Sequence, residues 1–170
     1  MKEYDLQKYL KSNELLNNKL EVYLKQKVLL KQKIDLEEIK GHLIKSEHNL
    51  RFSNTIKKEF LDWEIIAYYY SCYHAALALI KTKGYTSKNH LATLLILIKE
   101  YYGKELNDED IQTIENVLDY EDLLFYIETK NKREQASYST RTKFEDITKI
   151  RLNTTLFVNK IKRIIQEKFE

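Results

Sequence analysis

The stretch from Asp62 to Tyr85, DWEIIAYYYSCYHAALALIKTKGY, constrains the fold more than any other part of the sequence. Wound as a helix, it places apolar side chains on nearly every side, in stripes at spacings of three and four residues. A helix without a clear solvent face is typical of the centre of a bundle, so other helices are expected to surround it. We therefore predict that one such stripe is largely buried, namely Tyr70, Tyr73, Leu77 and Ile80.

The ends of this stretch carry helix-boundary signals. Asp62 can cap the first turn, and Gly84 can close the helix in the left-handed conformation. A membrane span needs about 20 consecutive apolar residues, whereas Glu64, His74 and four tyrosines interrupt this run. We therefore expect a core helix and no membrane contact.

Composition points to the same fold class. The chain of 170 residues has no proline and three glycines, and its length suits one domain with a sizeable core. Its abundant Leu, Ile, Lys, Glu and Tyr favour helices. We predict an all-α protein, an up-and-down bundle of about five or six helices without a β-sheet. The first residues lack the apolar core of a signal peptide, so a cytoplasmic protein is expected.

The first segment, Met1 to about Gln32, predicts one long amphipathic helix. Its apolar residues recur at alternating spacings of three and four, and Asn13 and Lys27 interrupt the seam. Such a helix could form a dimer contact or bind a partner, or it could pack on its own bundle, which we favour for so short a seam. We take residues 1–34 as an N-terminal helical extension and 35–170 as the bundle domain.

The starts of later helices are marked by capping residues. In chain order the expected N-caps are Asp35, Ser87, Asn107 and Thr142. Leu106 and Ile111 flank the third of these caps as a hydrophobic staple, and Gly103 ends the preceding helix. Between about Thr129 and Arg141 the apolar pattern stops, so we expect a loop or a frayed helix end there.

The cysteine and the histidines give no pattern of metal ligands. Cys72 lies on the apolar helix and is expected to be a buried small hydrophobe. Helical ligand pairs usually stand three or four residues apart, whereas His42 and His48 are six apart and His74 and His90 lie on different predicted helices. We expect no metal and no cofactor, a core role for His74 bonded to a tyrosine or a carbonyl, and a structural role for His90.

A basic cluster with one aromatic residue lies in the polar stretch near residue 135. Its members are Lys130, Lys132, Arg133, Tyr138 and Arg141. Guanidinium and ammonium groups bind phosphates, and a tyrosine can stack on a base, which is a common combination in nucleotide or RNA contacts. The net charge of +3 adds little to this interpretation. A solvated charged loop would explain the same residues equally well.

The sequence AYYYSCYHAALALIKTKGY at 67–85, with the Ser-Lys-Asn-His that ends at His90, resembles the HEPN domain, an all-helical family named for nucleotide binding. One small branch has an A-Y-Y-x-x-[FY]-H-A-A-x-A-L-L stretch, a glycine-bounded turn and a histidine that opens the next helix. The likeness covers about Asp35 to the C-terminus. It implies a HEPN-type bundle and a homodimer, and it suggests a toxin-like or accessory subunit beside a small nucleotidyltransferase, in a pair of the toxin–antitoxin type.

Many HEPN proteins are metal-independent ribonucleases that use an arginine followed, after four to six residues, by a histidine. None of the five arginines of this chain has a histidine at that spacing. The sequence REQASY, from Arg133 to Tyr138, is similar to the R-x-x-A-D-Y phrase of the small branch, with Ser137 in place of the acid. An ordinary tyrosine, with a pKa of about 10, is a poor general base at neutral pH. The resemblance therefore implies binding without efficient cleavage.

Three functional hypotheses follow. The leading one is a non-catalytic helical module that binds a nucleotide or RNA through the basic cluster and pairs with a nucleotidyltransferase. The first alternative is a metal-independent ribonuclease whose variant site consists of Arg133, Tyr138 and His90. The second is a purely structural protein that dimerises through its long helices.

Overall fold

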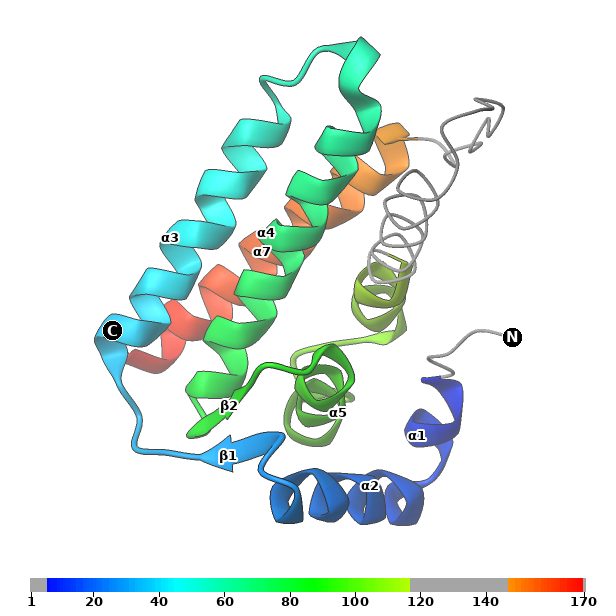
Figure 1. Cartoon of the computed structure of the whole chain (residues 1–170), viewed down its shortest axis with the longest axis vertical. Helices are drawn as coiled ribbons and strands as arrows, with labels where there is room; N and C mark the ends of the chain where they lie inside the picture. Colours follow the sequence, from blue (N-terminus) through cyan, green and yellow to red (C-terminus); the bar gives the residue numbers. More distant parts are fainter. Residues whose placement is uncertain (1–5, 117–146, 170) are drawn as a thin grey trace, which may run out of the picture.

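The computed structural model describes residues 6–116 and 147–169, and this part of the chain is mostly helical (Figure 1). Three long helices, α3 (Leu36–Ser53), α4 (Leu61–Lys81) and α7 (Ile147–Phe169), lie side by side, and a short 3-10 turn, η1 (Lys58–Phe60), precedes α4. Helix α5 (His90–Tyr101) packs with the N-terminal helices at one end of these three (Figure 1). The predicted all-α class is confirmed.

The N-terminal segment forms two helices, so the prediction of one long helix is wrong. Helix α1 (Gln7–Lys11) stops at Ser12, whose side chain accepts a hydrogen bond from the Leu15 amide at 3.2 Å and caps α2 (Asn13–Lys25). The apolar seam nevertheless packs on the protein's own core, as we favoured. Its buried members are Leu6, Tyr9, Leu16, Leu20 and Tyr23.

A two-stranded antiparallel sheet joins β1 (Leu29–Lys31) to β2 (Tyr85–Ser87), and this corrects the expectation of no β-sheet. The backbone amide of Gln32 donates to the carbonyl of Gly84 at 2.8 Å. Gly84 has a φ of 73°, as predicted, and a Cβ there would lie 2.7 Å from the Gln32 carbonyl oxygen. Only glycine fits this turn, which carries the chain from α4 back across the bundle.

Helices α3 and α4 run antiparallel and approach closely through two buried serines (Figure 1). The Ser46 hydroxyl donates to the Ser71 carbonyl at 2.7 Å, and the Ser71 hydroxyl donates to the Ser46 carbonyl at 2.8 Å. Each hydroxyl is therefore satisfied by the opposite helix, as buried polar groups require. Asp35 caps α3 as predicted, accepting from the amides of the second and third residues of that helix.

Helix α4 is less completely buried than predicted. Leu77 and Ile80 are buried and Tyr73 is half-buried, but Tyr70 is 45% exposed. The helix begins at Leu61, with Phe60 at the N-cap position, so the prediction of Asp62 as the cap is also wrong. Burial is most complete at its C-terminal end, where β2 and α5 pack against it (Figure 1). No described helix combines the length and the apolar composition needed to cross a membrane.

A buried ionic cluster joins α4 to α7. Glu64 is 2% exposed, and its carboxylate accepts hydrogen bonds from the Arg151 guanidinium and from the Tyr68 hydroxyl, the latter at 2.8 Å. Arg151 also donates from Nε to the Tyr68 hydroxyl at 2.8 Å. Burial, and the hydrogen bond to the carboxylate, raise the pKa of Tyr68. All three groups are thus satisfied within the cluster.

Helix α5 begins two residues later than predicted. Asn89, not Ser87, is its N-cap and accepts from the Ala92 amide at 2.9 Å. Ser87 ends β2, and its hydroxyl accepts from the Asn89 amide at 3.0 Å. The prediction is wrong because the serine braces the turn that precedes the helix.

The signals predicted at Gly103 and Asn107 are confirmed. Gly103 has a φ of 76° just beyond the last turn. Asn107 and Asp110 cap one another's amides, at 2.9 and 3.1 Å, at the start of a helix that the structure describes over 108–116. Leu106 and Ile111 are both buried, as a hydrophobic staple requires.

Candidate functional site

The basic cluster predicted as the binding site lies outside the described residues. This applies to Lys130, Lys132, Arg133, Tyr138 and Arg141, and also to the expected cap Thr142. Of the residues in the alternative ribonuclease site, the structure describes His90. This histidine lies in a pocket that the sequence did not predict.

The pocket has a volume of about 430 Å³ and lies where α3, α4, β2 and the start of α5 meet. We call it the tyrosine–histidine pocket; it is lined by His42, Tyr69, Tyr70, Tyr73, Leu77, Thr86, Ser87, Lys88 and His90. The members from α4 recur at helical spacing on one side of that helix. The turn at Gly84 brings β2 and the first residue of α5 to the same place.

Aromatic rings pack against one another around the pocket. The rings of Tyr69 and Tyr73 are nearly parallel, with 7° between their planes and 6.0 Å between their centroids. Tyr70 meets Tyr69 edge-on at 4.9 Å, and the His90 ring lies 4.3 Å from Tyr73. These contacts fix the rings against one another, and the exposed Tyr70 leaves an aromatic surface open to solvent.

His90 is held by a tyrosine of α4. The Tyr69 hydroxyl lies 2.9 Å from Nδ1 and 3.1 Å from Nε2 of the His90 ring. The imidazole can accept from the hydroxyl or donate to it, depending on its tautomer. This bond fixes the first turn of α5 against α4 and keeps His90 in the pocket wall.

His74 bonds to another histidine, so the expectation of a tyrosine or carbonyl partner is wrong. Nδ1 of His42 on α3 lies 3.0 Å from Nδ1 of His74 on α4, and both side chains are partly buried. Burial, His74 and the charges of Lys81 and Lys45 lower the pKa of His42 to about 4. Burial and Lys45 also lower the pKa of His74. The pair is therefore neutral at pH 7.

Two lysines at the pocket, Lys81 and Lys88, differ in whether their ammonium group is already paired within the protein. Lys81 is almost fully buried, and its Nζ donates to Glu38 at 2.6 Å and to the Thr86 hydroxyl at 3.3 Å. The hydrogen bond from Lys81 to Glu38, with one from Gln32, lowers the pKa of Glu38. Lys88 is exposed in the pocket wall and forms no ion pair with a described residue. Lys88 is thus a cation in the pocket wall that an anionic ligand could reach.

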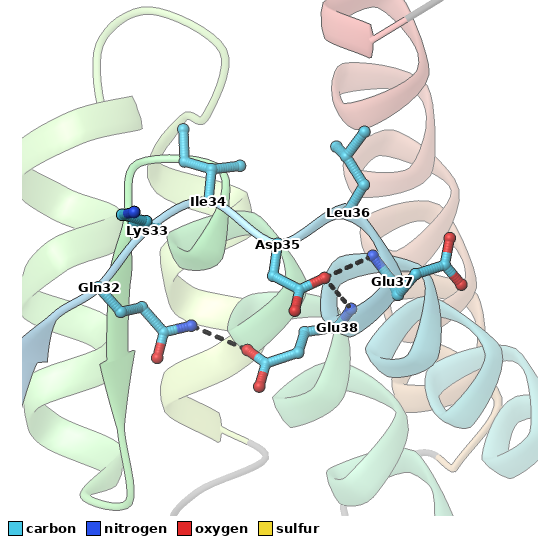
Figure 2. Close-up of a pocket in the computed structure, with 7 residues that line it drawn as sticks. All are labelled: Gln32, Lys33, Ile34, Asp35, Leu36, Glu37 and Glu38. Carbon is cyan, nitrogen blue, oxygen red and sulfur yellow. Dashed lines mark hydrogen bonds between the residues drawn. The ribbon is translucent and has the colours of Figure 1, made fainter.

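A larger hollow of about 630 Å³ is formed by residues 32–38, and its carboxylates and Gln32 already bond within the protein (Figure 2). Figure 2 shows Ile34 and Leu36 on one side of the segment and Asp35 on the other, accepting from two helix amides. Gln32 donates to Glu38 at 2.8 Å. Acidic side chains occupy the helix N-terminus here, so this hollow suits an anion poorly.

Other kinds of chemistry find little support among the described residues. No group of three or more His, Cys, Asp or Glu side chains in 6–116 and 147–169 could hold a metal ion. Cys72 is buried, as expected, and burial raises the pKa of its thiol to about 12. A thiol that stays protonated is a poor nucleophile.

No family model matches the chain, and no curated protein matches it either. The resemblance to HEPN proteins therefore stays a prediction that rests on the residues quoted for it.

Proposed function

We propose that the protein is a cytoplasmic helical module that binds a nucleotide or single-stranded RNA in the tyrosine–histidine pocket and does not cleave it. The observation that carries this proposal is a wall of packed tyrosine and histidine rings with the exposed Lys88 beside them. Stacking of a base on an aromatic ring is worth about 1 to 3 kcal/mol, and a basic residue beside the stack can contact phosphate.

The size and chemistry of the pocket suit such a ligand. Its volume of about 430 Å³ falls within the range of small-molecule sites. Tyr70 offers an exposed ring for stacking, the Thr86 hydroxyl, which accepts from Lys81, can still donate a hydrogen bond, and Lys88 offers charge. A flat, polar base attached to a phosphate uses all three.

Binding is tested with a short oligouridylate and wild-type protein, using fluorescence anisotropy at two salt concentrations. We expect weak, salt-sensitive binding, since counterions are released when phosphates are contacted. Lys88→Ala should weaken binding several-fold and reduce the salt slope by about 1, and Tyr70→Ala should weaken it with the slope unchanged. Lys99→Ala removes the same charge from an exposed position farther along α5 and serves as the control. Equal affinity for the two lysine variants would place the site elsewhere.

The absence of cleavage is inferred from the missing Arg-to-His spacing in the sequence. The ribonuclease alternative, with Arg133, Tyr138 and His90, is tested by incubating the same RNA with wild type, Arg133→Ala and His90→Ala. We expect no product above background from any of them. Cleavage by wild type that both variants lose would establish the ribonuclease instead.

The proposed biological setting is a homodimer that acts as a toxin-like or accessory subunit beside a nucleotidyltransferase. Its support is the resemblance of 67–90 to HEPN proteins. Light scattering at micromolar concentration tests the dimer, which a purely monomeric mass would exclude. Co-expression with a nucleotidyltransferase encoded next to this protein tests the pair, and the expected result is a complex that survives gel filtration.

A further inference from the structure

In the hydrogen bond between His42 and His74, the two facing Nδ1 atoms share a single hydrogen. With the two Nδ1 atoms 3.0 Å apart, one must carry the hydrogen and the other must accept it. His42 lines the tyrosine–histidine pocket, and its ring makes no other hydrogen bond to a described residue. Its Nε2 is therefore the nitrogen left for a ligand.

The pair can be charged once without losing this bond. In the neutral pair, His74 can donate from Nδ1 to His42, which then carries its own hydrogen on Nε2 and can donate it to a phosphate oxygen. One added proton creates an imidazolium that still shares the same Nδ1–H···Nδ1 bond. A second added proton would set two N–H groups against each other at 3.0 Å. The pair can thus accept one proton while α3 and α4 stay joined.

We propose that the His42–His74 pair is a phosphate-recognising subsite that takes up one proton when a phosphodiester binds in the tyrosine–histidine pocket. This inference rests on the proposed function, because it assigns a role within the same pocket. Affinity for a phosphodiester ligand then increases as the pH falls. A neutral nucleoside gains nothing from the added charge.

The surroundings of the pair explain why the free protein lacks this proton. The titratable groups near it come from every neighbouring element: Glu38 and Lys45 of α3, Tyr70, Tyr73 and Lys81 of α4, Lys88 before α5, and His90 at its start. Burial first, then His74 and the charges of Lys81 and Lys45, which oppose that of Glu38, keep the pKa of His42 near 4. A bound phosphate adds a negative charge beside the ring and favours the imidazolium.

The sign and size of the effect follow from linkage. Between the pKa of the pair in the free protein and its higher pKa in the complex, the complex binds one proton more. Each unit of falling pH in that window should tighten binding by up to about tenfold. The exact window depends on how far the phosphate raises the pKa, so the measurement spans about pH 5 to 8.

The experiment measures binding of a uridine oligonucleotide of about four residues across this range. A phosphodiester is chosen because the terminal phosphate of a nucleoside monophosphate itself titrates near pH 6. Calorimetry at about pH 6, in buffers of different ionisation enthalpy, counts the protons taken up by the wild type. We expect an uptake approaching one proton for the oligonucleotide and none for uridine.

The four histidines of the chain provide the variants. His42→Asn and His74→Asn should each flatten the pH dependence, whereas His48→Asn, at an exposed position of α3, should keep it. The proposal is overturned if the folded His42 and His74 variants keep the dependence of affinity on pH. It is also overturned if His90→Asn alone loses this dependence. Binding that is independent of pH in the wild type overturns it too and leaves the proposed function standing. Absence of oligonucleotide binding at every pH refutes both.

Discussion

The two halves of α4 have similar apolar composition and very different surroundings. In the C-terminal half, Leu79 and Ile80 are completely buried, whereas the N-terminal half buries one face, with Tyr68 at 0% exposure, and leaves Trp63 56% exposed and Tyr70 45%. The C-terminal half is packed against β2 and α5 in addition to α3 and α7 (Figure 1). The tyrosine–histidine pocket lies between the halves. An apolar helix thus becomes a core helix only along the length that other elements cover.

Buried charges follow the same division. In the N-terminal half the buried group is an acid, Glu64, paired with Arg151 of α7. Near the C-terminal end it is a base, Lys81, paired with Glu38 of α3. In each pair the partner remains about half exposed. Each end of α4 is therefore fixed to a different neighbour by a buried charge that would destabilise the fold if it lost its partner.

The largest expected effect is on the ionic cluster of the N-terminal half. Among the described residues, Arg151→Met leaves the buried carboxylate of Glu64 with only the Tyr68 hydroxyl as its partner, and should destabilise the protein by about 3 to 5 kcal/mol. Glu64→Gln is the matched variant, and it should cost less because the partly exposed Arg151 can turn to water. Urea denaturation measures both. A larger loss for Glu64→Gln would mean that the arginine, not the carboxylate, is the group that needs its partner.

A comparable effect is expected from packing in the C-terminal half. Ile80→Ala removes buried methyl and methylene groups from a site covered on all sides and should cost about 2 to 5 kcal/mol. The midpoint of urea denaturation should fall, while the dependence of the unfolding free energy on urea concentration should stay the same. A loss below about 0.5 kcal/mol, the range of ordinary surface substitutions, would contradict the assignment of this half to the core.

The stability of the protein should depend on pH through His42 and His74, which lie near the boundary between the two halves of α4. The pKa values of His42 and His74 are lowered in the folded protein, that of His42 to about 4, relative to about 6.5 in an unfolded chain. The unfolded chain therefore binds more protons below pH 6.5, and stability should fall as the pH drops from about 6.5 toward 4. The slope contributed by one such group is at most about 1.4 kcal/mol per pH unit.

Melting temperatures of wild type, His42→Asn and His48→Asn at several pH values check this expectation. The slope should be smaller for His42→Asn, and His48→Asn should match the wild type because its side chain is exposed on α3. Equal slopes for wild type and His42→Asn would show that other groups dominate the acid sensitivity.

Local signals predicted much of the fold. Asp35, Gly84, Gly103 and Asn107 act as expected because a cap or a left-handed residue works within one turn of chain. The sheet was missed because strands of three residues are too short to show alternation. Ser12 was missed as the break between α1 and α2 because the apolar seam continues through it.

The candidate site was harder to predict, since it depends on which residues of α3 and α4 lie opposite each other along the two helices. The sequence offered one usable signal. In antiparallel helices, residues equally distant from the connection lie opposite each other, and the pair His42 and His74 is centred on position (42 + 74)/2 = 58, within the connection at η1. Ser46 and Ser71 are centred at 58.5 by the same arithmetic. The predicted cluster between Lys130 and Arg141 lies outside the described residues and stays a prediction.

The smallest effect is expected at Trp63, and it tests the exposed face of the N-terminal half of α4 directly. Trp63→Ala removes a large side chain that is more than half exposed, so the loss of stability should stay below about 1 kcal/mol. Trp63 is the single tryptophan of the chain, so its fluorescence reports on this surface alone. Acrylamide should quench the wild-type emission readily at low protein concentration. If quenching weakens as the concentration rises and Trp63→Ala remains monomeric, a second copy covers this half of α4 and the contrast with its buried half holds only for the monomer. A stability loss above about 2 kcal/mol without any change in mass would instead place Trp63 in the core of the single chain.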